Sequence, residues 1–408
     1  MNNISKYISE HVLVGSKLVW FVLLALLAIS AVEVFSASSN MTYQSNDFWR
    51  PALNHAAMIM AGLAACCIIA RLNMTVLRLA AVLGYALGLC LLLCALLFGE
   101  SVNGATRWVF GLQPSEIAKG VLVMIVSLVL SHSIDPETHR VSPRGAKWCV
   151  GLTLLYCALI APENLSTAGL LFGVIVMLLF VGRVSVKQLA ILMAPLVLVA
   201  GLGYAFLKAT PMEDIRAMSE ISVGSSKPLH RLPTWANRVR SDDTNVSAAN
   251  YPINEHLQVA HAKIAIATSG FLGCGPGNSV ERDYLPQAFS DFIFAIILEE
   301  GGLAAGIFVV MLYVGLLFRV GLICRQCHER FPQLLAMGLT LLIVTQAMFN
   351  IAVAVGLLPV TGQQLPLVSR GGTGIVLNCC YIGMILAMTR MVQRMESEGE
   401  VECERVES

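Results

Sequence analysis

The sequence predicts an all-α polytopic membrane protein with about ten transmembrane helices and a large extracytoplasmic loop between helices 7 and 8. Hydrophobic residues make up 56% of the 408 residues, and charged residues only 13%. Soluble domains are usually about 45–50% apolar and about 25% charged, so this chain has more apolar surface than soluble cores bury. Long apolar runs, an uneven distribution of Lys and Arg, and one long polar insertion define the individual elements.

Ten apolar stretches are of a length that could cross a bilayer. The first follows a polar start without the pattern of a cleaved signal peptide, and we therefore expect it to be a retained helix. The second and third stretches, like the fifth and sixth, are joined by very short connections, as expected where hydrocarbon leaves no partner for an unpaired backbone. In chain order the stretches are 18–37, 53–70, 77–98, 115–131, 148–162, 165–182, 187–207, 302–319, 333–357 and 371–389.

The distribution of Lys and Arg predicts the orientation in the membrane. With the N-terminus in the cytoplasm, every cytoplasmic segment carries several of these residues, whereas the short outer loops carry only Arg50, Arg107 and Arg370. Both termini are therefore predicted to be cytoplasmic. We expect 1–392 to form a single membrane domain and 393–408 a disordered, acidic cytoplasmic tail. A net charge of +1, without a basic patch carrying aromatic residues, excludes a nucleic-acid partner.

The insertion at 208–301 is external on this topology. Its first half, 212–254, is polar and carries both signs of charge. In the second half, 256–272 is amphipathic and 290–298 is apolar, but both are too short to cross a bilayer, so we expect interfacial or re-entrant segments. The glycine-rich stretch between them, 270–278, follows a helix rather than a strand, which argues against a nucleotide loop and for a turn that approaches a head group.

Ionisable residues within apolar spans are candidates for function. Glu116 and Lys119 share one helix face, and could pair to fix that helix or line an outward-facing cavity. Asp291 could cap the following helix, or act as a general base beside an apolar wall. Arg370, before Gly371 and Gly372, could meet an anion, although the glycines could equally serve helix entry. Glu299 and Glu300, followed by two glycines, fit a closely packed helix join. These residues alone do not distinguish an enzyme from a transporter.

Taken in order, the motifs resemble the SEDS (shape, elongation, division and sporulation) family along the whole chain. The form Gly277-Asn278-Ser-Val280 is typical of the division branch, FtsW, rather than the elongation branch, RodA. The motifs are Gly104-Ala-Thr-Arg107-Trp108, Gln113-Pro-Ser-Glu116-Ile-Ala-Lys119, Ala262-Lys263-Ile-Ala-Ile266, Gly270-Phe-Leu-Gly273, Tyr284-Leu-Pro286, Asp291-Phe-Ile-Phe-Ala295, Gly356-Leu-Leu-Pro359 and Leu365-Pro-Leu-Val-Ser369-Arg-Gly-Gly372.

The resemblance implies a peptidoglycan glycosyltransferase that polymerises lipid II at the outer face of the cytoplasmic membrane, at the division septum. The implied partners are a class B penicillin-binding protein transpeptidase and other divisome membrane proteins. Asp291 matches the aspartate the family needs for activity, and a divalent cation, Mg²⁺ or Mn²⁺, could assist there. The residues implied in substrate binding are Arg107, Glu116, Lys119, Lys263, Asn278, Ser369 and Arg370. A lipid II flippase and a non-enzymatic divisome scaffold are the alternative functions.

Several positions depart from the family pattern. The motif before the sixth stretch reads Pro162-Glu-Asn-Leu-Ser-Thr167, the residues before the key aspartate read Gln287-Ala-Phe-Ser-Asp291, and Arg370 stands where the family has tyrosine. The lysine usual after the Leu-Leu-Pro motif is absent from Val360-Thr-Gly362. These changes leave Asp291 in place, but no role can be transferred for the missing aspartate, histidine and lysine.

Overall fold

The computed structural model describes residues 14–37, 50–98, 100–102, 105–108, 113–135, 137, 140–162, 164–220, 232–240, 257–284, 290–370 and 372–407. They are mainly helical, as predicted, and each of the ten predicted stretches overlaps a helix over most of its length. The chain packs as two compact units, of which the first comprises Met1–Gly84, Lys119–Leu128 and Leu257–Ser408, and the second Tyr85–Ala118 and Val129–His256. The predicted division into one membrane domain and a tail stays a prediction.

Eight helices are long and apolar enough to cross a membrane, which makes this a multi-pass membrane protein. They are α2 (Lys17–Ala37), α4 (Arg50–Ile69), α5 (Met74–Phe98), α6 (Pro114–His132), α9 (Val186–Ala209), α13 (Ile293–Gln326), α14 (Arg330–Ala354) and α15 (Thr373–Glu407). The other two predicted spans form α7 (Pro143–Ile160) and α8 (Leu165–Val181), which are less apolar or shorter. The count of ten spans therefore stays a prediction.

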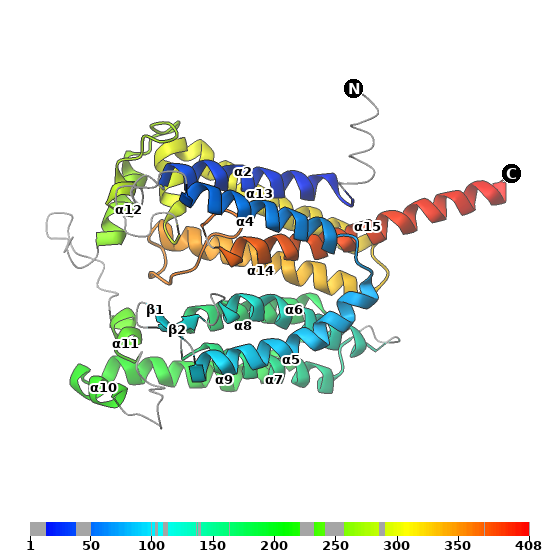
Figure 1. Ribbon diagram of the computed structural model, residues 1–408. Helices are drawn as coiled ribbons and strands as arrows, with labels where there is room; N and C mark the ends of the chain where they lie inside the picture. The colour runs from blue at the N-terminus through cyan, green and yellow to red at the C-terminus, as the bar shows by residue number, and fades with distance from the viewer. Residues whose placement is uncertain are drawn as a thin grey trace. The chain divides into compact units, whose positions relative to one another are not determined.

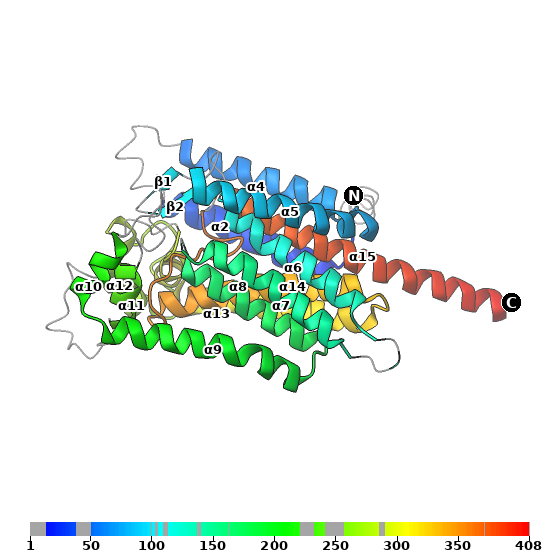
Figure 2. The same ribbon diagram turned by 90° about the horizontal axis from the view of Figure 1, so that it is seen from below.

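The first unit is built on α13, which packs against α2 and α14, while α15 packs along α4 (Figure 1). The middle of α6 belongs to this unit, and a Cβ atom at Gly120 would overlap the Tyr381 ring, so glycine permits close contact with α15. Helix α12 (Leu257–Thr268) and the C-terminal end of α15 lie at opposite ends of the unit in both views (Figures 1 and 2).

The second unit contains α7, α8 and α9 in mutual contact. Each starts with a short polar side chain that accepts a hydrogen bond from the first helical turn, namely Ser142, Asn164 and Ser185. Helices α10 (Met212–Ser219) and α11 (Leu232–Arg240) form a small core around Ile215, Leu232 and Ala236. The polar stretch 212–254 thus contains packed helices, while 221–231 and 241–254 lie outside the described residues.

Two features differ from expectation. Strands β1 (Glu100–Val102) and β2 (Ala105–Trp108) form a short antiparallel hairpin in the predicted third-to-fourth helix connection. The acidic end, expected to be disordered, instead continues α15 as helix through Glu407. A run of Met, Glu, Gln and Arg residues without proline favours that continuation.

Helix α13 is interrupted at Gly302, whose φ of 71° and ψ of −175° are not helical. The glycine-rich turn after α12 fills the break. The amides of Cys274 and Gly275 donate to the carbonyls of Glu299 and Glu300 at 2.9 and 2.8 Å. Beyond the break, the amides of Leu303 and Ala304 donate to the carbonyls of Gly270 and Phe271 at 3.1 and 3.2 Å.

The break divides α13 into a short buried helix, which follows Asp291, and a long helix beyond Gly302. The expectation of two separate segments, 290–298 and 302–319, is confirmed, as is the closely packed join at Glu299–Gly302. The glycine-rich turn was predicted to approach a head group, but its backbone instead pairs with the broken helix, because that break leaves carbonyl and amide groups without helical partners.

Candidate active site

Asp291 lies directly before α13, with its side chain partly buried. Phe292 occupies the N-cap position and makes no side-chain cap, so neither Ser290 nor Asp291 is the capping residue that spacing had suggested. The Ser290 hydroxyl donates to Asp291 Oδ1 at 3.0 Å. Ser290 and Asp291 thus lie just before the helix cap, and the general-base role of Asp291 stays a prediction.

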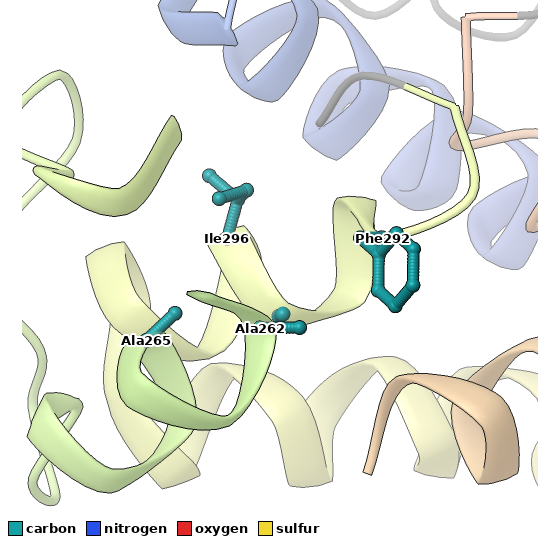
Figure 3. Packing of buried hydrophobic residues seen from close by; sticks show 5 residues of the cluster. Ala262, Ala265, Phe292 and Ile296 are labelled. Carbon is teal, nitrogen blue, oxygen red and sulfur yellow. The ribbon is translucent and has the colours of Figure 1, made fainter. Parts of the chain in front are cut away.

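Apolar packing fixes the helix that follows Asp291. Phe292, Ala295 and Ile296 are fully or almost fully buried against Ala262 and Ala265 of α12 (Figure 3). The small alanine side chains on α12 let α12 and α13 approach closely. Phe292, the residue after Asp291, is buried in this contact. The packing thus anchors the backbone on the C-terminal side of the carboxylate.

Two amide side chains on α14 hold the backbone around Asp291. Asn350 Nδ2 donates to the Asp291 carbonyl at 2.9 Å and to the Gln363 carbonyl at 2.6 Å. One turn earlier, Gln346 Nε2 donates to the Gln364 carbonyl at 3.0 Å. Residues four apart share one helix face, so α14 presents both amides to the segment 356–370.

Ser369 closes the other side of the site. Its hydroxyl donates to the Ser290 carbonyl at 2.6 Å and accepts from the Leu365 amide at 2.8 Å. Leu367, between Leu365 and Ser369, is buried and adopts a φ of 65°. This left-handed backbone conformation is costly for a bulky residue, and such strained residues cluster at functional sites. Segment 356–370 is thus held in one strained conformation beside Asp291.

Gly362 leaves room for the carboxylate. A Cβ atom at this position would lie 3.5 Å from Asp291 Oδ2, an ordinary van der Waals contact, so the Gly362 backbone passes close to the carboxylate. Its φ of 66° also favours glycine.

Replacing Asn350 with Ala should destabilise the site, because two buried carbonyls lose their donor at about 1–3 kcal/mol for each unsatisfied group. We expect a lower thermal unfolding temperature in detergent together with lower activity. Thr340→Val on the same helix is the matched control, since the buried Thr340 hydroxyl donates only within α14, to Ala336. Equal losses in the two variants would contradict a specific role for Asn350.

The other predicted residues are distributed around the first unit. Lys119 is buried, and its Nζ donates to Gln346 Oε1 at 2.8 Å, which links it to segment 356–370 through that amide. Lys263 is exposed on α12, and a Cβ at Gly356 would lie 3.1 Å from its Cε. Arg370 is half-buried, and burial lowers the pKa of its guanidinium, which nevertheless stays protonated at neutral pH.

Three predicted residues are not brought to Asp291 by any described contact. Asn278 is exposed and donates to the Cys274 carbonyl at 3.0 Å, which closes the glycine-rich turn. Arg107 lies in β2, and its side chain is outside the described residues, as are Glu163, Phe289 and Gly371. Glu116 lies in the first turn of α6, in the second unit. Their roles stay predictions.

A metal ion would need more ligands than Asp291. Among the described residues, no three His, Cys, Asp or Glu side chains are grouped closely enough to hold a metal. Mg²⁺ and Mn²⁺ prefer several oxygen ligands, which the protein side chains described here do not supply at Asp291. We therefore derive no reaction step through a metal.

Asn350 and Gln346 are the functional residues that sequence reasoning missed. A signal was present, because two amide side chains four residues apart within an apolar span are costly unless they find partners. They were missed because only ionisable residues were taken as candidates within the apolar spans.

Comparison with known proteins gives the family. Residues 16–394 match the FtsW, RodA and SpoVE family, described as cell cycle proteins. The chain is 29% identical over 387 residues to a probable peptidoglycan glycosyltransferase FtsW of Halomonas elongata, covering 91% of this chain and 90% of that protein. It is 32% identical over 313 residues to the protein of the same name from Nitrosococcus halophilus, covering 74% and 72%.

Solved structures share the fold. One chain from a peptidoglycan synthase complex that coordinates polymerisation and crosslinking aligns with a TM-score of 0.68 and 21% identity, covering 93% of this chain and 98% of that one. The rod shape determining protein RodA of Thermus thermophilus aligns with a TM-score of 0.62 and 20% identity, covering 92% and 97%. With the family match over most of its length, the chain belongs to the FtsW, RodA and SpoVE family, the SEDS proteins, and its relatives named here are of the FtsW branch.

Proposed function

We propose that this protein is a peptidoglycan glycosyltransferase that polymerises lipid II into glycan strands at the outer face of the cytoplasmic membrane during septal wall synthesis. The observation that carries the proposal is the position of Asp291. It lies just before α13 in the sequence, Gly362 passes close to its carboxylate, and the backbone around it is held by Asn350 and Ser369. The family match and the names of the relatives support the same reaction.

Asp291 acts as the general base in this proposal. The 4-hydroxyl of the acceptor sugar attacks the anomeric carbon of the donor, and its proton passes to the Asp291 carboxylate. The bond between the anomeric carbon and the diphosphate oxygen breaks as the new glycosidic bond forms, so the configuration inverts and the electron pair leaves with undecaprenyl diphosphate. A base positioned within about 3 Å of the hydroxyl contributes roughly 10²–10⁴-fold to such a step.

The leaving diphosphate needs positive charge or hydrogen-bond donors. Arg370 ends segment 356–370, which passes Asp291, and Lys263 of α12 lies beside Gly356 of that segment. We propose that both contact the diphosphate. Arg107 and Lys119 were predicted for the same role. Lys119 already donates to Gln346, so we assign it to hold that amide and, through it, the segment.

A class B penicillin-binding protein is the proposed partner, and other divisome membrane proteins would assemble around the pair. The structural similarity to a chain of a peptidoglycan synthase complex supports this arrangement. The position of α12 and the C-terminal end of α15 at opposite ends of the first unit supports a cytoplasmic C-terminus and an outer site (Figure 1).

Polymerisation in detergent tests the function. The purified protein, together with its cognate class B penicillin-binding protein, should convert lipid II into long glycan strands that a gel resolves. Detergent micelles have no two sides, so polymer formed there cannot result from translocation. A stable complex that moves lipid II across vesicles but makes no polymer would identify a flippase, and one that does neither would identify a scaffold.

A further inference from the structure

The segment 279–284, which follows the glycine-rich turn, is held by side chains that the proposed reaction does not use. Its first contact is with Glu299, which is buried near the break in α13. The Ser279 hydroxyl donates to Glu299 Oε2 at 2.5 Å, and the amides of Val280 and Glu281 donate to Oε1 at 2.9 and 3.3 Å. One carboxylate thus accepts three hydrogen bonds from one short stretch of chain and fixes that stretch.

Arg282 ties the same segment to α2. Its Nη1 donates to the Ser36 carbonyl at 3.1 Å and approaches the Ser36 hydroxyl at 2.8 Å. The same nitrogen lies 3.7 Å from Glu300 Oε1, and the side chains of Arg282 and Glu300 are only 14% and 1% exposed. Ser36 also donates from its hydroxyl to Glu300. Removing one partner from so buried an ion pair leaves the other charge uncompensated.

A third contact joins the segment to α12. His261 Nδ1 lies 2.5 Å from Glu281 Oε2, and the His261 ring stacks on Tyr284 with centroids 5.2 Å apart. The segment is therefore held from α2, α12 and α13 at once.

In the sequence, Asp291 lies between the residues that these contacts join. Segment 279–284 precedes Asp291, whereas Glu299 and Glu300 follow it at the end of the short helix. The hydrogen bond between Ser279 and Glu299 and the ion pair between Arg282 and Glu300 thus close a loop that contains Asp291, and Ser36 fixes that loop to α2. Closing a loop restricts the conformations of the residues inside it.

We propose that Arg282, Ser36, Glu299 and Glu300 form a clamp that positions Asp291 for proton transfer. The clamp is a positioning device and does not contact substrate, and its role in catalysis rests on the proposed function. A base displaced by about 1 Å loses roughly 10²-fold in rate, so release of the clamp should lower kcat while leaving KM for lipid II nearly unchanged.

The test compares Arg282→Ala, Arg282→Lys and Glu300→Gln in the complex with the class B penicillin-binding protein. We expect Arg282→Ala to lower kcat by about 10–100-fold. Arg282→Lys should recover part of that loss, since it restores the charge without the planar fork of donors. Because Arg282 and Glu300 act through one contact, the double variant Arg282→Ala with Glu300→Gln should lose little more than either single variant.

Glu33→Gln is the matched control. Glu33 is also a buried acid on α2, 7% exposed. Its Oε2 has no hydrogen-bond partner among the described residues, and it takes no part in the clamp. The control should keep the wild-type kcat. An unchanged kcat in Arg282→Ala, or equal losses of kcat and thermal stability in Arg282→Ala and Glu33→Gln, would overturn the proposal.

Hydrogen exchange of residues 279–300 separates failure of the clamp from failure of the proposed function. Arg282→Ala should accelerate exchange there, and Glu33→Gln should not. If the wild-type complex makes no polymer, the proposed function fails, and the exchange still decides whether the clamp holds the chain around Asp291. Unchanged exchange in Arg282→Ala would contradict the clamp whatever the activity.

Discussion

Asp291→Asn is expected to abolish glycan-strand formation from lipid II while leaving the protein folded. Asparagine keeps the size of the side chain but cannot accept the hydroxyl proton, and loss of a general base costs about 10²–10⁴-fold in rate. The fold should persist because the backbone contacts do not involve the carboxylate. Asn350 and Ser369 bond to the carbonyls of Asp291 and Ser290, which the substitution leaves in place.

The measurement is polymer yield against time, with thermal unfolding of the same detergent preparation as the check on folding. Asp214→Asn is a suitable control, since Asp214 is an exposed aspartate on α10 of the same predicted outer loop. It should retain wild-type activity. Wild-type rates in Asp291→Asn would rule out Asp291 as the base and would direct attention to the segment's other polar groups.

Hydropathy predicted the helices, whereas the family resemblance singled out Asp291. Spans such as α14 and α15 were predictable because a long apolar run satisfies its backbone only as a helix in hydrocarbon. Asp291 could not be separated from a helix cap by spacing, and only the resemblance favoured it as the base. In the structure Phe292 takes the N-cap position, while the role of Asp291 as the base stays a prediction.

Contacts between distant parts of the chain could not be predicted. Ser369 contacts Ser290 and Asn350 contacts Gln363 and Asp291 only because α13, α14 and segment 356–370 fold together. The helical tail also escaped prediction, since its acidic composition suggested disorder although its residues favour helix. Local pattern therefore gave the elements, whereas the arrangement around Asp291 depends on tertiary packing.

The role of the glycine-rich turn is another example. From sequence it was a turn that could approach a head group, because no local pattern shows that it pairs with the helix join at Glu299–Gly302. In the structure, Gly273 and Gly302 face each other so closely that a Cβ atom on Gly273 would lie 2.5 Å from the Gly302 amide nitrogen. Neither glycine indicates this backbone contact from its local sequence.

Gly302→Ala should be the most destabilising single substitution in this region. At φ 71° and ψ −175° the backbone lies where essentially only glycine is found, at about 1–3 kcal/mol for another residue. The added Cβ would also overlap the Phe271 carbonyl and lie 2.5 Å from the Gly273 amide, and such overpacking typically costs about 1–3 kcal/mol more. Both neighbours are backbone atoms, so no side chain can move aside.

Two control variants separate these causes. Gly277→Ala has a φ of 84° but nothing within 4 Å of its Cβ, so it should show the conformational cost alone. Gly315→Ala, in the long part of α13, has neither constraint and should be neutral or slightly stabilising. We expect thermal unfolding temperatures in the order Gly315→Ala, Gly277→Ala, Gly302→Ala, from highest to lowest.

Polymerisation should fall with Gly302→Ala beyond the loss of folded protein, because the turn that fills the break also leads into the segment before Asp291. Wild-type stability in Gly302→Ala would mean that the break is not held by the glycine contact, and the clamp around Asp291 would then lose its structural basis at Glu299 and Glu300.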